Sequence, residues 1–433
     1  MKYYSLNNKS VFVDFKTATI NGQAPDKGLY FPERIPKITQ QWIENIENIS
    51  NEQIAFDVIK PFVGNCIPDE VLFDIVSETV NFSIPLKQIN SNISSLELFH
   101  GPTLAFKDVG ARFMSRCLGY FSKEKEQELL ILVATSGDTG AAVANGFYNV
   151  AGVKVLILFP SGKVSSVQEK QLTTLGNNIH ALEVEGSFDD CQALVKQAFF
   201  DKELNQKVFL TSANSINVAR WLPQQFYYFF AYKQWAAKSN PPVVAVPSGN
   251  FGNICAGILA QQSGLPIHHF IAACNANDTV PEFLQTNQYS PKSTVATISN
   301  AMDVSDPSNF IRILEIFQQN IDAIKLNMSS CSISDAATAA TIKRIHQQYG
   351  YLLDPHGAVG YVALENYLQQ HPQQKGIFLE TAHPIKFYNV IESILGNSLN
   401  MPASIQSVIN KKSVSKKIKP QYNNLLENIY GLY

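Results

Sequence analysis

Three apolar runs, each followed by a short turn of small polar residues, constrain the fold of this chain most strongly. They cover residues 129–134, 153–159 and 243–246, and each is apolar on both faces of an extended strand. Strands of this kind are typical of buried parallel sheets, and a turn leading into a helix completes a βα unit. The pattern therefore predicts an α/β protein with parallel sheets.

The turns after these runs are where we expect a ligand, because open α/β sheets bind ligands at the carboxyl ends of their strands. The turns read T-S-G-D-T-G at 135–140, P-S-G-K at 160–163 and P-S-G-N at 247–250. Apolar residues at helical spacing predict helices over 141–148, 189–200 and 334–349, the last with Ser334 as N-cap.

Composition excludes several classes of protein. The 433 residues include 34 Lys and Arg against 36 Asp and Glu, a formal net charge of −2 that argues against a nucleic-acid binder with a basic face. With 45% hydrophobic residues the chain is not disordered, and no apolar run reaches the ~18 to 20 residues of a membrane span. We expect a folded protein with a site for a small molecule and no membrane partner.

The N-terminus and the cysteines bear on the compartment. No apolar stretch with a small-residue cleavage site follows Met1, so we expect no signal peptide and a cytoplasmic protein. The six cysteines are scattered without a C-x-x-C pair, which predicts neither zinc, nor any other metal, nor disulfides. The lysines between 411 and 419 indicate only a solvated surface or tail.

The turn at 247–253 has the properties of a phosphate site. Gly249 and Gly252 allow a ligand to approach the backbone closely, and a helix begins just beyond them with unpaired N–H groups. The turn contains no lysine and does not match the nucleotide-binding pattern G-x-x-x-x-G-K-[ST]. An ordinary turn between a strand and a helix is the alternative.

Lys107 is a candidate nucleophile. It follows mainly apolar residues and precedes a predicted helix at 108–118. Apolar surroundings disfavour the charged form of a lysine, which lowers its pKa and frees an amine. The alternative is an amphipathic lysine with its ammonium group in solvent.

Two further turns complete the candidate site. Ser136, Thr139 and the backbone amides at a helix start form a cluster of donors suited to a carboxylate. The segment E-T-A-H-P at 380–384 ends the apolar stretch 376–379. Each could also be an ordinary βα turn.

Taken together, the segments 97–108, 134–144, 247–257 and 381–387 closely resemble the threonine synthase family of the bacterial and fungal type. The resemblance extends through 28–32, 212–217 and 300–304. It implies a pyridoxal-phosphate enzyme of fold type II, the tryptophan synthase β-like fold, with two interleaved open twisted-sheet domains and an N-terminal region. The implied boundaries are 1–95 for the N-terminal domain and 96–433 for the catalytic region, with a smaller subdomain at roughly 110–222.

The resemblance also assigns residues to the cofactor, pyridoxal 5'-phosphate. Lys107 would bond to its aldehyde and act as a base, and Thr381 would face the pyridine nitrogen. Asp138 would face the cofactor, although many fold-type-II relatives carry Asn there and an ionised Asp cannot donate to the phenolic oxygen. The implied phosphate cradle is Gly249, Asn250, Phe251, Gly252 and Asn253.

The implied substrate is O-phospho-L-homoserine, which water converts to L-threonine and phosphate. Ser136, Gly137 and Thr139 match the loop that binds the substrate carboxylate. Asn214, Ser215 and Arg220 match positions around its phosphate, where the arginine fork suits a dianion. Lys163 is a further candidate, with an ordinary surface lysine as the alternative.

Two other functions remain open from the sequence. A phospholyase or dehydratase on the same fold would share Lys107 but release a 2-keto acid and ammonia. A catalytically silent relative would act as a binding or regulatory protein, which the intact Lys107 and the segment 136–139 argue against. We expect a monomer or homodimer.

Overall fold

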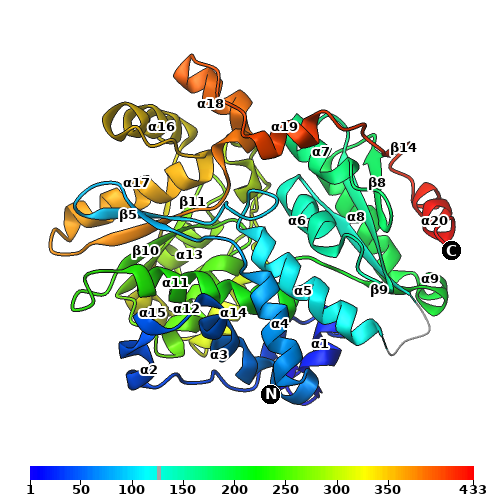
Figure 1. The fold of residues 1–433 in the computed structure, drawn as a ribbon, viewed down its shortest axis with the longest axis horizontal. Coiled ribbons are helices and arrows are strands. Elements are labelled where there is room, and N and C mark those ends of the chain that lie inside the picture. Colours follow the sequence, from blue (N-terminus) through cyan, green and yellow to red (C-terminus); the bar gives the residue numbers. More distant parts are fainter. Residues whose placement is uncertain (124–127) are drawn as a thin grey trace.

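The strands predicted from the apolar runs lie in two separate sheets (Figure 1). The computed structural model describes residues 1–123 and 128–433. Strands β6 (Leu129–Ala134) and β7 (Val153–Pro160) lie in one sheet, and β10 (Val243–Pro247) lies in the other. Every residue of β6 and β10 is buried, which is why these strands read as continuous apolar runs. The α/β fold with parallel strands is confirmed.

The larger sheet has six strands in the order β12-β11-β10-β13-β5-β4. All neighbouring pairs are parallel except β4 and β5. Its other strands are β4 (Leu86–Gln88), β5 (Ile93–Glu97), β11 (His269–Cys274), β12 (Met328–Ser332) and β13 (Gly376–Glu380).

The smaller sheet has five strands in the order β14-β8-β7-β6-β9, all parallel. Its remaining strands are β8 (Ile179–Val184), β9 (Phe209–Thr211) and β14 (Lys416–Ile418). The helices around it are α5 (Lys107–Ser122), α6 (Asp138–Phe147), α7 (Ser166–Thr173), α8 (Phe188–Phe200), α9 (Lys202–Lys207) and α10 (Val218–Trp221).

Helices cover the larger sheet as well, and α17 packs against β10 and β13. They are α11 (Gln225–Gln234), α12 (Gly252–Gln262), α13 (Thr279–Thr286), α14 (Phe310–Ile316), α15 (Ile321–Asn327), α16 (Asp335–Tyr349), α17 (Pro355–Gln370) and α18 (Tyr388–Leu395), with 3-10 helices η3 (Leu222–Gln224), η4 (Asn300–Met302) and η5 (Pro384–Phe387).

The predicted helices are all present, with ends that differ by a few residues. The helix predicted at 108–118 is α5, and those predicted at 141–148 and 189–200 are α6 and α8. Ser334 caps α16 as predicted, since its side chain accepts a hydrogen bond from Ala337 N at 3.3 Å.

The N-terminal region has a small antiparallel sheet of its own, in the order β2-β1-β3. Arg312 of α14, which is fully buried, ties this region to the larger domain by donating to the carbonyl oxygens of Tyr30 at 3.0 Å and Ile216 at 2.6 Å. The elements are β1 (Lys2–Ser5), β2 (Phe12–Asp14), α1 (Phe15–Asn21), β3 (Tyr30–Pro32), α2 (Gln40–Glu44), η1 (Ile46–Asn48), α3 (Asn51–Val63), η2 (Gly64–Cys66) and α4 (Asp69–Thr79).

The C-terminal segment runs from the larger domain to the smaller one (Figure 1). After β13 and α18 it forms α19 (Ala403–Ile409), which packs on α7, and then β14, which pairs with β8. Helix α20 (Tyr422–Tyr430) packs on α8. The lysines between 411 and 419 are exposed as predicted, but three residues of this stretch, 416–418, form an edge strand rather than a tail.

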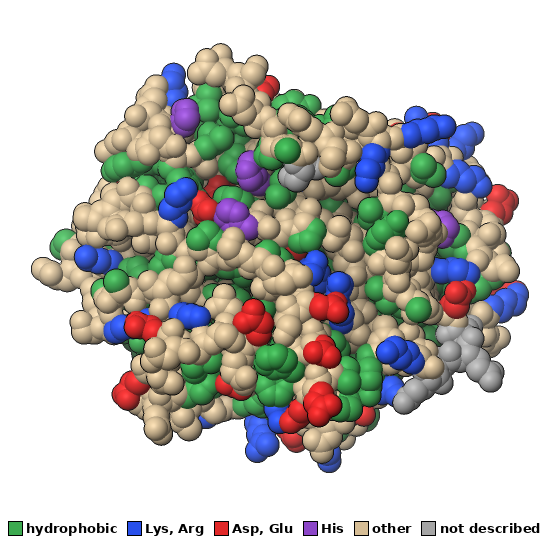
Figure 2. Space-filling model, viewed as in Figure 1, with side chains coloured by type: hydrophobic (Ala, Val, Ile, Leu, Met, Phe, Trp, Pro, Cys, Tyr) green, Lys and Arg blue, Asp and Glu red, His purple; other side chains and the backbone are tan. Residues whose placement is uncertain are grey.

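Charge is distributed without a dominant sign over the face in Figure 2, where acidic and basic side chains are interspersed over the lower half. Basic side chains gather at the upper right, over the region of α19 and β14. All six cysteines are free thiols, and four of them are buried. Among the described residues, no helix has both the length and the apolarity to cross a membrane.

Candidate active site

Lys107 is the first residue of α5, and the end of β13 fixes the backbone just before it. Phe106 N donates to Thr381 O at 2.8 Å, and Ala105 forms a β-bridge with Ala382. The Tyr227 hydroxyl donates to Phe106 O. These contacts bring Lys107 and Thr381 together, although they lie far apart in the sequence.

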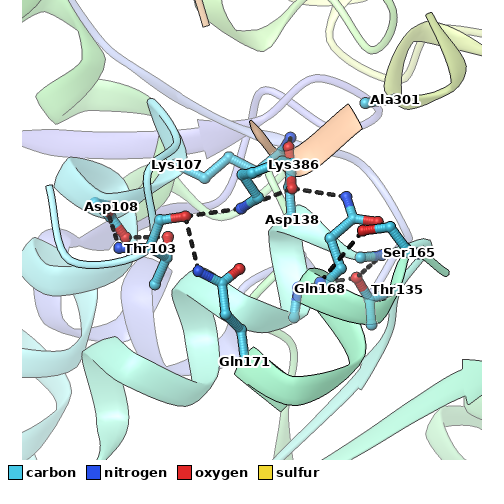
Figure 3. Close-up of polar contacts among 12 residues, drawn as sticks. Thr103, Lys107, Asp108, Thr135, Asp138, Ser165, Gln168, Gln171, Ala301 and Lys386 are labelled. Atoms are coloured by element: carbon cyan, nitrogen blue, oxygen red, sulfur yellow. Dashed lines mark hydrogen bonds and ion pairs between the residues drawn. The ribbon is translucent and has the colours of Figure 1, made fainter. Parts of the chain in front are cut away.

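Two cations share one buried carboxylate beside this point (Figure 3). The Nζ atom of Lys107 lies 3.8 Å from Oδ2 of Asp138, and the Nζ atom of Lys386 lies 2.8 Å from Oδ1. The Lys107 side chain is 17% exposed, and the side chains of Asp138 and Lys386 are 4% and 0% exposed. The alternative of a solvent-facing Lys107 is therefore wrong.

The charge states of this cluster follow from burial and from its neighbours. Burial lowers the pKa of Lys107, the charge of Asp138 opposes that shift, and Lys386 adds to it. Burial alone would raise the pKa of Asp138, but the ammonium groups of Lys386 and Lys107 outweigh burial and hold that pKa well below its usual range. Asp138 is therefore a carboxylate, and the ammonium form of Lys107 is less favoured than that of an exposed lysine.

The predicted phosphate loop lies at the same sheet edge as Thr381, because β10 and β13 are adjacent parallel strands. Phe251 adopts a left-handed conformation with φ 58° at the N-terminus of α12, a strained backbone geometry that is common at ligand sites. Gly249 passes close to another backbone, since a Cβ atom there would lie 2.7 Å from Met302 Cα. A larger residue at 249 would displace the loop.

Hydrogen bonds join this loop to the region predicted for the substrate. The Asn250 side chain donates to Ser215 Oγ at 2.7 Å and accepts from Ser308 N at 2.7 Å. Asn309 Nδ2 donates to Asn250 O at 3.0 Å. The candidate cofactor residue Asn250 and the candidate substrate residue Ser215 are thus in direct contact.

The start of α6 is built by Thr135, which the sequence analysis did not single out. Its Oγ1 accepts from the backbone N–H groups of Gly137 and Gly140, both at 2.9 Å, so these two amides are already paired. Gly137 has φ 137°, and a Cβ atom there would lie 2.5 Å from the Gln168 side chain. Ser136 is exposed and Thr139 half-buried, so both side chains can reach a ligand at this edge.

The remaining candidates differ in how they are placed. Arg220 is 3% exposed and donates to Ala213 O, and its Nε is buried without a hydrogen-bond partner among the described residues. Asn214 is half-buried in the same loop. Lys163 is exposed in the turn after β7, and within the described residues no ion pair or hydrogen bond of its side chain joins it to the other candidates.

Comparison with known proteins identifies the family. A model of pyridoxal-phosphate dependent enzymes matches residues 85–379, and models of the threonine synthase N-terminus and C-terminal region match 2–80 and 357–429. Threonine synthase of Buchnera aphidicola subsp. Schizaphis graminum is 45% identical over 99% of both chains. Threonine synthase of Escherichia coli K12 is 45% identical over 94% of both. The chain belongs to the threonine synthase family.

Solved structures of threonine synthases match the whole chain. The enzyme from Escherichia coli aligns with a TM-score of 0.93 at 42% identity, covering all of both chains. The PLP-bound enzyme from Brucella melitensis aligns with a TM-score of 0.94 at 34% identity, covering 100% of this chain and 99% of that one. The chain is thus a PLP-dependent lyase of fold type II, which confirms the fold and cofactor predictions.

The predicted cofactor residues fit a phosphorylated aldehyde. The side-chain nitrogen of Asn253, at the start of α12, is buried without a hydrogen-bond partner among the described residues. A buried donor of this kind is costly unless a ligand accepts from it. Together with the α12 N-terminus and the close backbone approach at Gly249, it suits an anionic phosphate, and Lys107 suits an aldehyde.

Sequence analysis missed three polar side chains of the site. Lys386 and Thr135 are described above, and Gln168 donates to Asp138 Oδ1 at 2.8 Å. Thr135 lies in the segment 134–144 and Lys386 in the segment 381–387, and both segments resemble the family. That resemblance was the signal from which these two residues could have been found. Within the described residues, no group of His, Cys, Asp or Glu is arranged to hold a metal ion.

A cluster of buried acids lies directly beside Thr381. Glu380 is fully buried and accepts from Asp354 N at 2.6 Å, and its Oε2 has no hydrogen-bond partner among the described residues. Burial, followed by the charge of Asp354, raises the pKa of Glu380 well above its usual value. The Asp354 carboxylate contacts Nδ1 of His356, whose Nε2 accepts from Ala301 N at 3.2 Å. Burial therefore favours the protonated form of Glu380 beside Thr381.

Proposed function

We propose that this threonine synthase family enzyme converts O-phospho-L-homoserine and water to L-threonine and phosphate. The observation that carries the proposal is identity of 45% over 99% of a relative named threonine synthase. A tomato threonine deaminase structure shares only the fold, at 13% identity and a TM-score of 0.56. Likeness of that kind does not favour a dehydratase.

Three groups of this chain would hold the cofactor. Lys107 would bond to its aldehyde, the segment 249–253 would bind its phosphate, and Thr381 would face its pyridine nitrogen. Bound pyridoxal phosphate supplies an aldehyde that captures amines and a conjugated ring that accepts electrons from the substrate. A threonine hydroxyl is neutral, so it does not hold the nitrogen protonated as a carboxylate would.

Lys107 would act as the base once the substrate amine has replaced it. Burial lowers the pKa of Lys107, which reduces the cost of forming the free amine that would take the Cα proton. Over the whole reaction the Cγ–O bond to phosphate and one Cβ–H bond break, Cγ gains a proton, the hydroxyl group of water bonds to Cβ, and the other proton of water leaves with the phosphate. Lys107 would carry protons between these carbon atoms, because it lies beside both Asp138 of α6 and Thr381 at the end of β13.

The substrate's two anionic groups would bind on opposite sides of Lys107. Ser136 and Thr139 would bind the carboxylate at the start of α6, where Gly137, with φ 137°, would let the loop turn toward it. Arg220, with Asn214 and Ser215, would bind the phosphate, and the unpaired Nε of Arg220 supports this role. Lys163 remains a weaker candidate, because it is exposed and joined to none of these residues.

A single assay distinguishes this function from its alternative. The purified protein with pyridoxal phosphate is given O-phospho-L-homoserine, and threonine, phosphate, 2-keto acid and ammonia are measured together. We expect threonine and phosphate in equal amounts. Keto acid and ammonia in amounts equal to phosphate would establish the phospholyase instead, and no turnover would favour the binding protein.

We further propose that the enzyme works in the cytoplasm as a monomer or homodimer. Support for the cytoplasm comes from the free thiols. Sedimentation equilibrium of the purified protein, with and without cofactor, measures the mass directly. A stable assembly larger than a dimer would contradict the proposal.

A further inference from the structure

Lys386 is a buried cation at the candidate site to which the proposed mechanism gives no role. It lies in η5, and none of its side chain is exposed. Its Nζ atom has two partners, Asp138 Oδ1 at 2.8 Å and the carbonyl oxygen of Thr103 at 2.7 Å. A buried ammonium is stable only when it is paired in this way. The pair of Lys386 and Asp138 is therefore a fixed part of the fold.

The two oxygens of Asp138 have unequal partners (Figure 3). Oδ1 accepts from both Lys386 and Gln168, each at 2.8 Å. Within the part of the chain that the structure describes, the charged partner of Oδ2 is Lys107 at 3.8 Å, which is too long for a hydrogen bond. Lys386 thus neutralises the carboxylate at close range, and Lys107 is held loosely.

We propose that Lys386 is a positioning residue that neutralises and orients Asp138, so that the amine of Lys107 can lose its proton within the folded site. The uncharged amine is the form that attacks an aldehyde and that accepts a proton from a substrate. This inference rests on the role proposed above for Lys107.

The charge balance among Lys107, Lys386 and Asp138 explains why Lys386 affects the proton on Lys107. With both lysines protonated, two positive charges share one negative charge, and burial disfavours the excess. When Lys107 loses its proton, the neutral pair of Asp138 and Lys386 remains. Without Lys386, Asp138 would pair with Lys107 alone, and the neutral state of the cluster would require Lys107 to stay protonated.

Other charged groups face these side chains and remain when Lys386 is replaced. Arg220 and Asp354 act on Lys107 in opposite directions. Asp108 and His383 face Lys386. The direction of each effect agrees with the geometry. Burial lowers the pKa of Lys107, the neighbouring charge of Asp138 raises it, and the charge of Lys386 lowers it.

The test measures the proton on Lys107 directly, in the full-length chain prepared without cofactor. Trinitrobenzenesulfonate reacts only with an uncharged amine, and mass mapping of the peptide that contains Lys107 gives the rate at each pH. In Lys386→Met we expect the midpoint of this profile to rise by about one pH unit or more. Lys386→Arg keeps the charge and should restore a midpoint close to that of the wild type.

Two further variants guard against a merely structural effect. Asp138→Asn should move the midpoint down, opposite to Lys386→Met, because Lys107 then loses its nearest anion while Lys386 remains. Lys386→Gln can still donate to Asp138 and Thr103, so it carries the same test if the methionine variant does not fold. Lys233→Met is the matched control, since Lys233 hydrogen-bonds to Ile49 O and Asn51 Oδ1 away from the site.

The outcome does not depend on turnover, so failure of this inference and failure of the proposed function are distinguishable. An unchanged or lowered midpoint in a Lys386→Met or Lys386→Gln protein that unfolds at the wild-type temperature would overturn the inference. So would a Lys386→Arg midpoint as high as that of the methionine variant.

Discussion

At the scale of single residues, the two ionisable groups with the strongest consequences are Lys107 and Glu380. Burial lowers the pKa of Lys107, which favours its free amine, and raises the pKa of Glu380, which favours its protonated acid. For both groups, folding therefore makes the charged form less favourable than it is in water.

Replacing Lys107 with alanine removes the amine that bonds to the cofactor. We expect the absorbance band of the holoenzyme at about 410–430 nm to disappear, because a lysine–cofactor bond cannot form. Threonine formation should fall by about 10³-fold or more. Spectra and product assays of the variant, beside Lys233→Met, check both effects. Wild-type turnover in the alanine variant would exclude Lys107 from the chemistry.

Replacing Glu380 with glutamine should stabilise the protein increasingly as the pH rises. The raised pKa means that the folded protein keeps this proton above pH 4.5 while the unfolded chain releases it, so wild-type stability falls with rising pH. Glutamine removes this dependence, and its advantage should grow by up to about 1.4 kcal/mol per pH unit until the folded-state pKa is passed.

Urea unfolding of the Glu380→Gln variant and wild type between pH 5 and 8 measures this difference. Glu365→Gln, at the partly exposed ion pair with Arg344, is the control and should show no such trend. A stability difference that stays constant across the pH range would mean that Glu380 is ionised in the folded protein.

At the scale of elements, the turn between β6 and α6 depends on one hydroxyl group. Thr135 is 1% exposed and pairs two backbone amides at the start of α6. Valine has nearly the same shape but no acceptor, so Thr135→Val should cost about 2–4 kcal/mol in the free energy of unfolding. Thr135→Ser, which keeps the hydroxyl, should cost about 1 kcal/mol. Equal losses in the two variants, measured by urea unfolding, would contradict the capping role.

Elements also show what the sequence could and could not predict. Strands β6, β7 and β10 were predicted nearly to the residue, because burial on both faces leaves a continuous apolar run. Strand β14 was missed because it is three residues long and two of them are exposed lysines. Edge strands are commonly protected by lysine, which erases the apolar signal.

The same reasoning applies to the site. Lys107 and the loop at 249–253 were predicted from the sequence as candidates with ordinary alternatives, and the family resemblance supplied the roles proposed for them. Lys386 was missed because its role depends on burial and on Asp138, which lies at the start of α6, far from Lys386 in the sequence. No local pattern distinguishes a lysine with 0% exposure from one on the surface.

At the scale of the whole molecule, the C-terminal segment connects the two domains, and its anchor is apolar. Leu425 of α20 is fully buried with Ile418 and Ile429 in the core that covers the outer face of the smaller sheet. Leu425→Ala should cost about 2–5 kcal/mol. Hydrogen exchange should quicken in β8 and α8 while the larger domain is unaffected.

Val414→Ala provides the matched control for Leu425→Ala. Val414 lies in the same segment with 65% of its side chain exposed, so its truncation should change stability by less than about 0.5 kcal/mol. Faster exchange spread evenly over both domains in Leu425→Ala would show that the segment stabilises the molecule as a whole.

The pairing of β14 with β8 also sets the order in which the chain can be completed during synthesis. The ribosome makes β6, β7, β8 and β9 early, whereas β14 emerges among the last residues. Until then β8 is an open edge whose backbone donors and acceptors can recruit a strand from another chain. A nascent chain without β14 therefore exposes an edge on which other chains can aggregate, and the pairing of β14 with β8 covers that edge.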